Sequence, residues 1–264
     1  MRLPVRRRGL IVFAGIWAVK AQTAARESSL VSDIPSLIAA ARSAVLPIGQ
    51  FDPLASPRFR FRGTAFAVGN GHHVVTNHHV IAGPDVKADA WVLRQQISGD
   101  SDHWRRLEVV SQDPVHDLAL LRVADERPLP ALRLAPDERL REGTAVLLMG
   151  FPVAGLLGFQ PVTHRGMVSS IAPMVLPAAN AGRLDERAIA SLRRGAFDIV
   201  QLDATAYPGN SGGPVLDAET GEVLAVVNMV LTKGGREGAL QHPSGISYAI
   251  PGRWVRALLT TGGR

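Results

Sequence analysis

The chain has no cysteine among its 264 residues. Structural disulfides, catalytic thiolates and zinc–thiolate sites are therefore excluded. Aromatic residues are scarce at 5%, whereas 46% of the residues are hydrophobic, which is an ordinary globular composition. No internal repeat or coiled-coil heptad is visible, and the 26 glycines and 18 prolines are scattered between apolar runs. This distribution favours many short strands over long helices.

The N-terminal segment has the pattern of an export signal. Three arginines, residues 6–8, precede an apolar run from Leu10 to Val19, and small residues follow it. The run is about half as long as a membrane-spanning helix needs to be. We therefore expect a cleaved signal peptide over residues 1–24 and a periplasmic or secreted protein, with an uncleaved membrane tether as the alternative.

The net charge of +6 belongs to this same segment. Residues 1–21 hold five of the 29 basic residues and no acid, so 24 bases face 23 acids in the rest of the chain. A nearly neutral chain without a basic stripe argues against nucleic-acid binding. The basic cluster Arg58–Arg62 is interpreted as one solvated face of an alternating strand.

Two series of short apolar runs, separated by turn residues, predict an all-β fold of two six-stranded antiparallel barrels with a short C-terminal helix. The first barrel is expected at about 42–125, a connection at 126–143, the second barrel at about 144–251 and a closing helix at 252–260. Leu176–Ala196 interrupts the second series as an insertion of helical composition. The expected strands are Ala44–Gly49, Thr64–Val68, His73–Thr76, Ala90–Arg94, Leu107–Val110, Leu118–Val123, Ala145–Met149, Val162–Ser170, Ile199–Asp203, Gly212–Leu216, Val223–Met229 and Ile246–Ile250.

The sharpest chemical signal is the segment Tyr207–Pro214, in which Ser211 stands among glycines. A serine nucleophile needs a tight turn that exposes its hydroxyl and directs neighbouring backbone N–H groups at an oxyanion. Glycine permits such a turn. A glycine-rich hairpin with an incidental serine is the alternative interpretation of this segment on its own.

Two further segments supply the partners that such a serine requires. Val74–Ile81 contains His78 and His79, and Asp113–Leu121 places Asp117 at the start of an apolar strand. A histidine base oriented by a buried carboxylate completes a catalytic triad. Each segment alone also suits a turn or a strand start, so the prediction depends on their joint occurrence in the order His, Asp, Ser.

Together these segments resemble the HtrA-like (Deg-type) branch of the trypsin-like serine proteases. The resemblance covers about Ile34 to Leu259 and implies that residues 25–264 form a serine protease domain. Further matching stretches are Gly63–Phe66, Gly143–Pro152, Val162–Ser169 and Gly245–Pro251. The resemblance implies a serine endopeptidase without a cofactor or metal, with a catalytic triad of His79, Asp117 and Ser211 and an oxyanion hole from Gly209, Asn210 and Ser211. His79 is preferred to His78 because the family's histidine directly precedes a valine.

The sequence also departs from this branch. The chain ends about thirteen residues after Pro251, so we expect no PDZ peptide-binding module, and the caged oligomers of the better-known relatives are not implied. An oligomer remains open. Asn210 precedes the nucleophile where digestive relatives carry an aspartate that pairs with a newly cut N-terminus. Activation by that ion pair is therefore not expected.

By the same resemblance, the pocket for the substrate residue before the scissile bond is lined by Thr205, Ala206, Asn228, Met229, Val230 and Ile246. None of these side chains is acidic, so an arginine or lysine would be buried without a partner. The sequence therefore predicts cleavage of unfolded or misfolded polypeptides after small or medium aliphatic residues.

Three other functions fit parts of the sequence. A zinc site on His72, His73, His78 and His79 is disfavoured, because consecutive residues of a strand point to opposite faces. A catalytically weak peptide-binding or chaperone module on the same fold would be expected to lack a triad member. An acyl hydrolase with the same triad stays possible, although the G-x-S-x-G elbow of α/β-hydrolases is not matched at Ser211.

Overall fold

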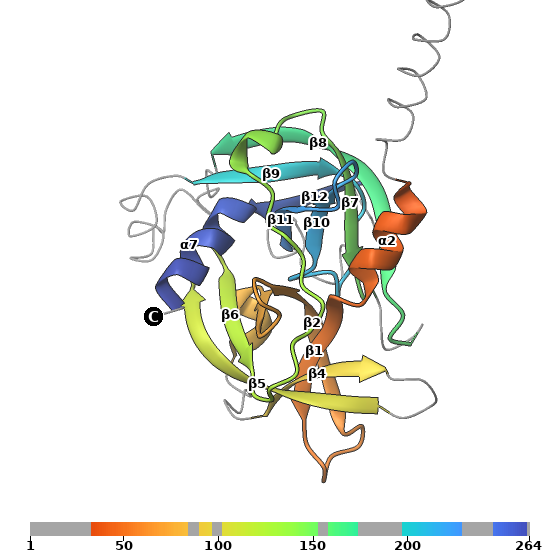
Figure 1. Ribbon diagram of the computed structural model, residues 1–264, viewed down its shortest axis with the longest axis vertical. Coiled ribbons are helices and arrows are strands. Elements are labelled where there is room, and N and C mark those ends of the chain that lie inside the picture. The colour runs from red at the N-terminus through yellow and green to blue at the C-terminus, as the bar shows by residue number, and fades with distance from the viewer. Residues whose placement is uncertain are drawn as a thin grey trace, which may run out of the picture.

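The computed structural model describes residues 33–83, 90–96, 102–152, 158–173, 197–228 and 245–262. In this part of the chain, twelve strands form two closed barrels with the strand orders β1-β2-β3-β6-β5-β4 and β10-β11-β12-β9-β8-β7 (Figure 1). Neighbouring strands pair antiparallel throughout both barrels. The predicted fold class is confirmed.

The first barrel follows the predicted order of strands. Its apolar runs are buried, but several strands extend beyond them because alternate polar residues face solvent along a half-exposed strand. The last strand is buried at five of its six positions, which explains why its bounds match the prediction. The strands are β1 (Val45–Phe51), β2 (Phe59–Val68), β3 (His73–Thr76), β4 (Trp91–Gln96), β5 (Asp102–Asp113) and β6 (Leu118–Val123).

The second barrel has the same antiparallel architecture. Its strands are β7 (Ala145–Gly150), β8 (Val162–Pro173), β9 (Asp198–Asp203), β10 (Pro214–Asp217), β11 (Val223–Asn228) and β12 (Ile246–Pro251). One buried cluster contains side chains of both barrels, among them Phe66 and Leu118 from the first and Met149 and Leu216 from the second. The two barrels therefore share a hydrophobic core along their seam.

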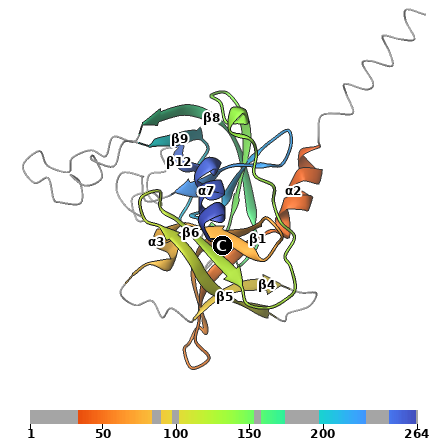
Figure 2. The same cartoon turned by 60° about the vertical axis from the view of Figure 1, so that its left-hand side comes forward.

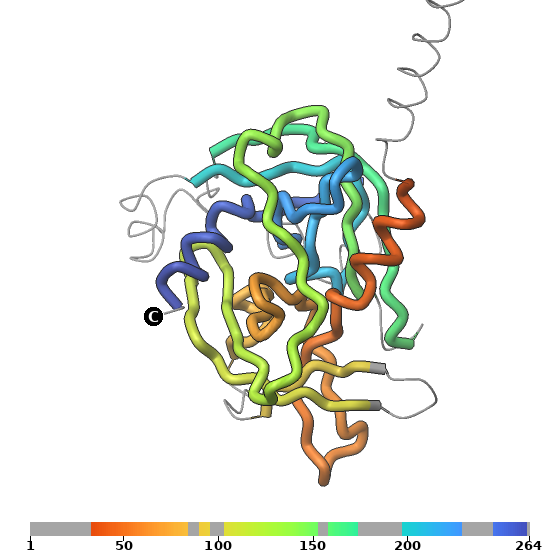
Figure 3. The backbone as a smooth tube through the Cα atoms, viewed as in Figure 1, coloured from red at the N-terminus to blue at the C-terminus, as the bar shows by residue number. Residues whose placement is uncertain are grey.

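Two elements outside the barrels reinforce this seam. Residues 124–144 run along both barrels (Figure 3), with single bridges from Leu132 to β2 and from Leu134 to β11. The helix α7 (Gly252–Gly262) follows β12 and packs back against β5 and β6 of the first barrel (Figure 2). Val255 and Leu258 are its buried apolar side chains.

Three short helical elements complete the described chain: α2 (Ile34–Arg42), α3 (His78–Ile81) and the 3-10 turn η1 (Asp137–Arg139). The sequence analysis missed α2 and α3. A four-residue helix such as α3 is too short to display helical periodicity. None of the described helices is long and apolar enough to span a bilayer. The predicted signal peptide and the insertion Leu176–Ala196 lie outside the described residues.

Candidate active site

His79 and Asp117 meet at the seam of the barrels. β3 ends at Thr76, and the one-turn helix α3 follows it and carries His79. The carboxylate of Asp117 lies 2.6 Å from Nδ1 of His79 and also accepts the backbone N–H of His79 at 2.8 Å. One carboxylate thus fixes both the ring and the backbone of the histidine. With Nδ1 bound, Nε2 is the ring nitrogen left to exchange a proton.

Asp117 holds an unusual backbone conformation. Its φ of 52° makes it the one non-glycine residue with positive φ in the described part of the chain. Aspartate tolerates this left-handed region better than most residues. Its carbonyl oxygen accepts hydrogen bonds from the backbone N–H of His78 at 3.1 Å and from Nδ2 of Asn77 at 3.0 Å. The α3 turn therefore holds Asp117 through its main chain as well as through its carboxylate.

Asn228 provides a third contact to this carboxylate. Its Nδ2 donates to Oδ2 of Asp117 at 2.9 Å, and the residue is 2% exposed at the end of β11. The sequence analysis assigned Asn228 to the wall of the specificity pocket and missed this contact. The available signal was an amide that ends a strand whose other side chains are all apolar.

The segment around Ser211 forms two tight turns. The N–H of Asn210 donates to the carbonyl of Tyr207 at 2.9 Å, and Gly209 has a φ of 106°. Proline followed by glycine with positive φ matches a type II turn. Ser211 is 4% exposed. In the described part of the chain, neither the N–H of Gly209 nor that of Ser211 has a hydrogen-bond acceptor. Both groups are thus available to an incoming oxyanion.

The side chains of Asn210 and Ser211, unlike the backbone of the turns, lack hydrogen bonds within the described part of the chain. Both polar side-chain atoms of Asn210 are buried and have no hydrogen-bond partner among the described residues. No hydrogen bond joins the Ser211 hydroxyl to His79 among the described residues. Contacts between a nucleophile and its base are often loose in the free protein and tighten when substrate binds.

Thr64 of the first barrel ties this segment across the seam. Its N–H donates to the carbonyl of Ser211 at 2.9 Å, and its hydroxyl donates to the carbonyl of Gly209 at 2.7 Å. The hydroxyl of Thr76, at the end of β3, donates to the carbonyl of Thr64 at 2.7 Å. A chain of hydrogen bonds therefore links the Ser211 segment to the strand that leads into His79. Sequence reasoning recognised Thr64 only as part of a motif.

Gly212 permits this close approach. A Cβ at this position would overlap the carbonyl oxygen of Thr64 and the hydroxyl of Thr76, and would lie 3.1 Å from the backbone nitrogen of Asn77. The backbone next to Ser211 thus lies against the end of β3, three residues before His79. The structure brings the three predicted triad residues to one seam.

The predicted pocket residues are only partly described. Ala206 is buried, and its N–H donates to Oγ of Ser247 at 2.8 Å. Ser247 in turn donates to the carbonyl of Ala204 at 2.6 Å, so it holds the segment before the nucleophile against β12. Thr205 is half-buried and Ile246 is 41% exposed beside them. Met229 and Val230 lie outside the described residues.

Two histidines outside the candidate triad, His73 and His164, have a lowered pKa. Burial, followed by the nearby charges of His72 and Arg122, lowers the pKa of His73, and burial lowers the pKa of His164. His164 lies beside the ring of Tyr207, with centroids 5.9 Å apart. No group of three or more His, Asp or Glu residues in the described ranges is arranged to hold a metal ion.

Known proteins are similar in sequence to this chain over most of its length. The trypsin-like peptidase domain matches residues 63–226. The chain is 34% identical over 76% of its length to serine protease HTRA2, mitochondrial, of Bos taurus. It is 30% identical over 78% of its length to a probable periplasmic serine endoprotease DegP-like of Marinomonas sp. (strain MWYL1). Each alignment covers 36% of the relative, so the chain spans about a third of these proteins.

Solved structures show the same fold. The HtrA-type protease AlgW with decapeptide superposes with a TM-score of 0.61 at 22% identity, over 87% of this chain and 67% of that one. AlgW with tripeptide gives the same TM-score at 23% identity, over 87% of this chain and 63% of that one. The chain therefore belongs to the trypsin-like peptidase domain family and is HtrA-like in its relatives and its fold.

Proposed function

We propose that this protein is a serine endopeptidase that cleaves polypeptides through Ser211, His79 and Asp117. The observation that carries the proposal is the double contact of Asp117 with the ring and the backbone of His79. Asn228 supports the same carboxylate. A carboxylate held in this way orients the base and stabilises the imidazolium that forms during acyl transfer.

The reaction would proceed in two halves. The Ser211 hydroxyl oxygen attacks the carbonyl carbon of the scissile bond while Nε2 of His79 takes the hydroxyl proton. The oxyanion accepts hydrogen bonds from the N–H groups of Gly209 and Ser211. The turn closed by the N–H of Asn210 holds these two groups in place. The carbon–nitrogen bond then breaks, and His79 returns the proton to the amine. Water, activated by the same histidine, hydrolyses the acyl-enzyme.

The substrates that we propose are unfolded or misfolded polypeptides, cleaved after small or medium aliphatic residues. An unfolded segment can extend along the seam, whereas a folded surface presents its peptide bonds in compact elements. The described pocket residues Thr205, Ala206 and Ile246 carry no charge, which supports an aliphatic preference. The AlgW structures with a tripeptide and a decapeptide are consistent with a peptide ligand.

We further propose that the protein is exported to the periplasm. The pattern of residues 1–24 supports a secretory signal. The bacterial relatives from Marinomonas and Pseudomonas putida carry the name of probable periplasmic serine endoproteases. Fractionation of cells that express the full chain, combined with N-terminal sequencing of the recovered protein, tests both the compartment and the cleavage of the signal.

The test of the catalytic proposal compares covalent labelling with proteolysis. A fluorophosphonate probe is expected to label the unmutated protein, and casein is expected to be cleaved. Ser211→Ala should abolish both. Labelling with ester hydrolysis but without cleavage of casein would instead indicate an acyl hydrolase. Peptide binding without labelling would indicate a non-catalytic module.

The choice of histidine has a matched control within α3. His79→Ala should lower kcat by about 10³-fold or more, since it removes the base of the triad. His78→Ala should have a mild effect, because Nδ1 of His78 has no hydrogen-bond partner among the described residues. The contact of His78 with Asp117 is made by its backbone N–H, which alanine keeps. The reverse order, in variants whose circular dichroism is unchanged, contradicts the assignment of His79.

A further inference from the structure

Five aromatic side chains form a continuous row on the first barrel and the segment before β8. The ring centroids are 5.6 Å apart from Phe61 to Phe159, 5.4 Å from Phe159 to Phe59, and 5.0 Å for the contacts of Trp104 with Phe59 and with Phe51. We call these residues the aromatic row. All five are half-buried. The sequence has only 14 Phe, Trp and Tyr residues, so a cluster of five of them on one surface is a candidate binding site.

The row begins at the candidate active site. A Cβ placed on Gly209 would lie 3.1 Å from Cε1 of Phe61, so this ring touches the turn that offers an oxyanion N–H. The predicted pocket for the residue before the scissile bond involves a different part of the molecule, because Ala206 precedes this turn and contacts Ser247 of β12 in the second barrel. Phe61 belongs to β2 of the first barrel, so we assign the row to the part of a bound polypeptide that follows the scissile bond.

The rings are held in place. Gly49 in β1 leaves space for Phe59, because a Cβ at Gly49 would come within 2.7 Å of that ring. The guanidinium of Arg94 lies 4.0 Å from the centroid of Phe159 and 6.0 Å from that of Trp104, both within the range of cation–π attraction. A fixed aromatic surface binds a partner at a lower entropic cost than a mobile one.

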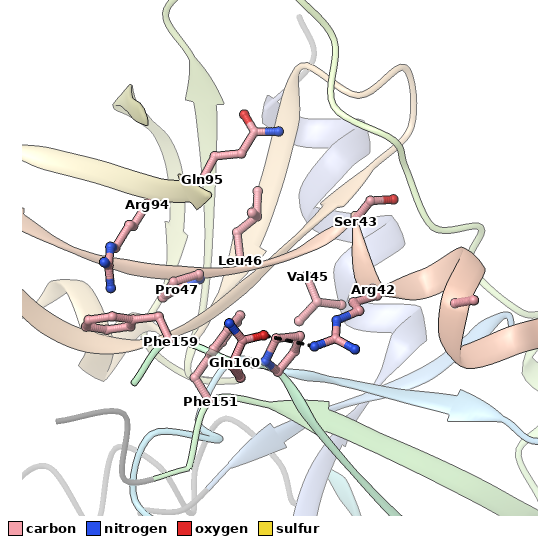
Figure 4. Close-up of a pocket in the computed structure, with 12 residues that line it drawn as sticks. Arg42, Ser43, Val45, Leu46, Pro47, Arg94, Gln95, Phe151, Phe159 and Gln160 are labelled. Atoms are coloured by element: carbon pink, nitrogen blue, oxygen red, sulfur yellow. Dashed lines mark hydrogen bonds between the residues drawn. The ribbon is translucent and has the colours of Figure 1, made fainter. Parts of the chain in front are cut away.

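A pocket of about 340 Å³ opens beside the row at Phe159. Figure 4 shows Phe159 next to Arg94 and Pro47, with Phe151 below them. On its far side, Arg42 donates a hydrogen bond to the side chain of Gln160 at 3.0 Å. A substrate side chain that packs on the ring of Phe159 would therefore also lie next to this pocket.

We propose that the aromatic row binds substrate downstream of the scissile bond and selects an aromatic side chain at the third residue after that bond. An extended chain advances about 3.3 Å per residue, so about three residues lead from the turn at Gly209 past Phe61 to Phe159. Aromatic side chains gain most from offset or edge contacts with such rings. This inference rests on the proposed function, because it takes the scissile bond to lie at Ser211.

The test measures binding and cleavage separately. Full-length protein that carries Ser211→Ala is titrated against fluorescent peptides that have valine before the scissile bond and either Phe or Gly at the third residue after it. We expect the Phe peptide to bind about ten-fold more tightly. Adding Phe159→Ala should remove this difference and weaken the binding of the Phe peptide more than that of the Gly peptide. Leu54→Ala is the control, because Leu54 is 95% exposed in the hairpin that joins β1 and β2.

Equal affinities for the two peptides would overturn the inference. An equal loss for both peptides in Phe159→Ala would also overturn it, because the ring would then be structural. Cleavage of both peptides by the unmutated protein at equal kcat/KM contradicts the aromatic row and leaves the endopeptidase proposal intact. An aromatic preference in binding without any cleavage contradicts the endopeptidase proposal, and the aromatic row is then a peptide-binding surface with no scissile bond to follow.

Discussion

Trp254 of the C-terminal helix stacks on His116, with ring centroids 3.6 Å apart and planes 18° from parallel. His116 immediately precedes Asp117, and its Nδ1 lies 2.5 Å from a carboxylate oxygen of Asp113. The ring of Phe197 makes a T-shaped contact with the same imidazole, with centroids 4.7 Å apart. The helix that closes the second barrel thus supports the turn of the first barrel that presents the candidate triad carboxylate.

Replacing Trp254 should therefore affect both stability and catalysis. Trp254→Ala is expected to lower the free energy of unfolding by about 2 kcal/mol, through lost apolar burial and ring stacking. It should also lower kcat, because the backbone of Asp117 loses its support. Trp254→Phe should keep most of both. Urea unfolding and peptidase assays measure the two effects. An unchanged unfolding midpoint in Trp254→Ala would show that the stacking contributes nothing.

The amide of Asn228 offers a test of how the carboxylate is oriented. Asn228→Ala removes one donor from Asp117, and we expect kcat to fall by about ten-fold with little change in KM, because a charge-assisted hydrogen bond contributes ~1.5–3 kcal/mol. Asn228→Asp keeps the shape but places a second carboxylate at the same oxygen, so the loss should be larger. Equal activities of the two variants would mean that Asn228 acts only through packing.

The glycine after the nucleophile has a natural control elsewhere in the chain. Gly212 and Gly143 have nearly the same φ, 84° and 83°. A Cβ at Gly143 meets no described residue within 4 Å, whereas one at Gly212 overlaps Thr64 and Thr76. Gly143→Ala should cost about 1–2 kcal/mol of stability, the penalty for an alanine in the left-handed region.

Gly212→Ala adds a steric clash to the same conformational penalty. We expect it to cost clearly more stability than Gly143→Ala and to abolish activity, because the Ser211 segment has to move away from β3. Thermal unfolding and fluorophosphonate labelling of the two variants make the comparison. Equal stabilities would show that the seam can widen at low cost.

The sequence allowed some of this site to be predicted and not the rest, for physical reasons. β6 and the turn at Ser211 could be predicted because their signals are local. A continuous apolar run indicates a buried strand, and glycines on both sides of Ser211 indicate a tight turn. The contacts of Thr64 with Gly209 and of Asn228 with Asp117 join positions 145 and 111 residues apart. No local sequence pattern encodes such contacts, so the roles of Thr64 and Asn228 can be seen only in the folded structure.

Burial of His164 predicts a loss of stability in acid. Burial lowers its pKa below the ordinary 6.5, and its buried Nε2 has no hydrogen-bond partner in the described part of the chain. As the pH falls below 6.5, the unfolded chain therefore binds the proton more readily than the folded one, and stability decreases until the lowered pKa has been passed. The contribution is fully present above pH 6.5.

A His164→Gln variant isolates this effect. Its urea midpoint should fall less than that of the unmutated protein when the pH is lowered through this range. Some dependence should remain, since the pKa of His73 is also lowered and acts with the same sign. Parallel pH profiles for the two proteins would contradict the assignment to His164.

The last prediction concerns the residue before the scissile bond. Thr205 and Ala206 lead into the nucleophile turn without a carboxylate, and Ser247 holds this segment against β12. An arginine in the pocket would lose its hydration without gaining a partner. Apolar pockets separate side chains that differ by one methylene by only about 1–3 kcal/mol. We therefore expect loose cleavage after Val, Leu, Ala or Met, and rejection of Arg and Lys.

Mass-spectrometric mapping of the cuts in casein tests this preference, and Thr205→Asp sharpens the test. Thr205 is one of the predicted pocket residues, so a carboxylate there should raise the share of cuts after Arg and Lys. Ser211→Ala, treated in the same way, reveals any contaminating protease. A majority of basic cuts by the unmutated protein contradicts the apolar pocket. If Thr205→Asp loses activity without gaining cuts after Arg or Lys, Thr205 lies outside the pocket. The new carboxylate is then buried without a cationic partner and only destabilises the protein.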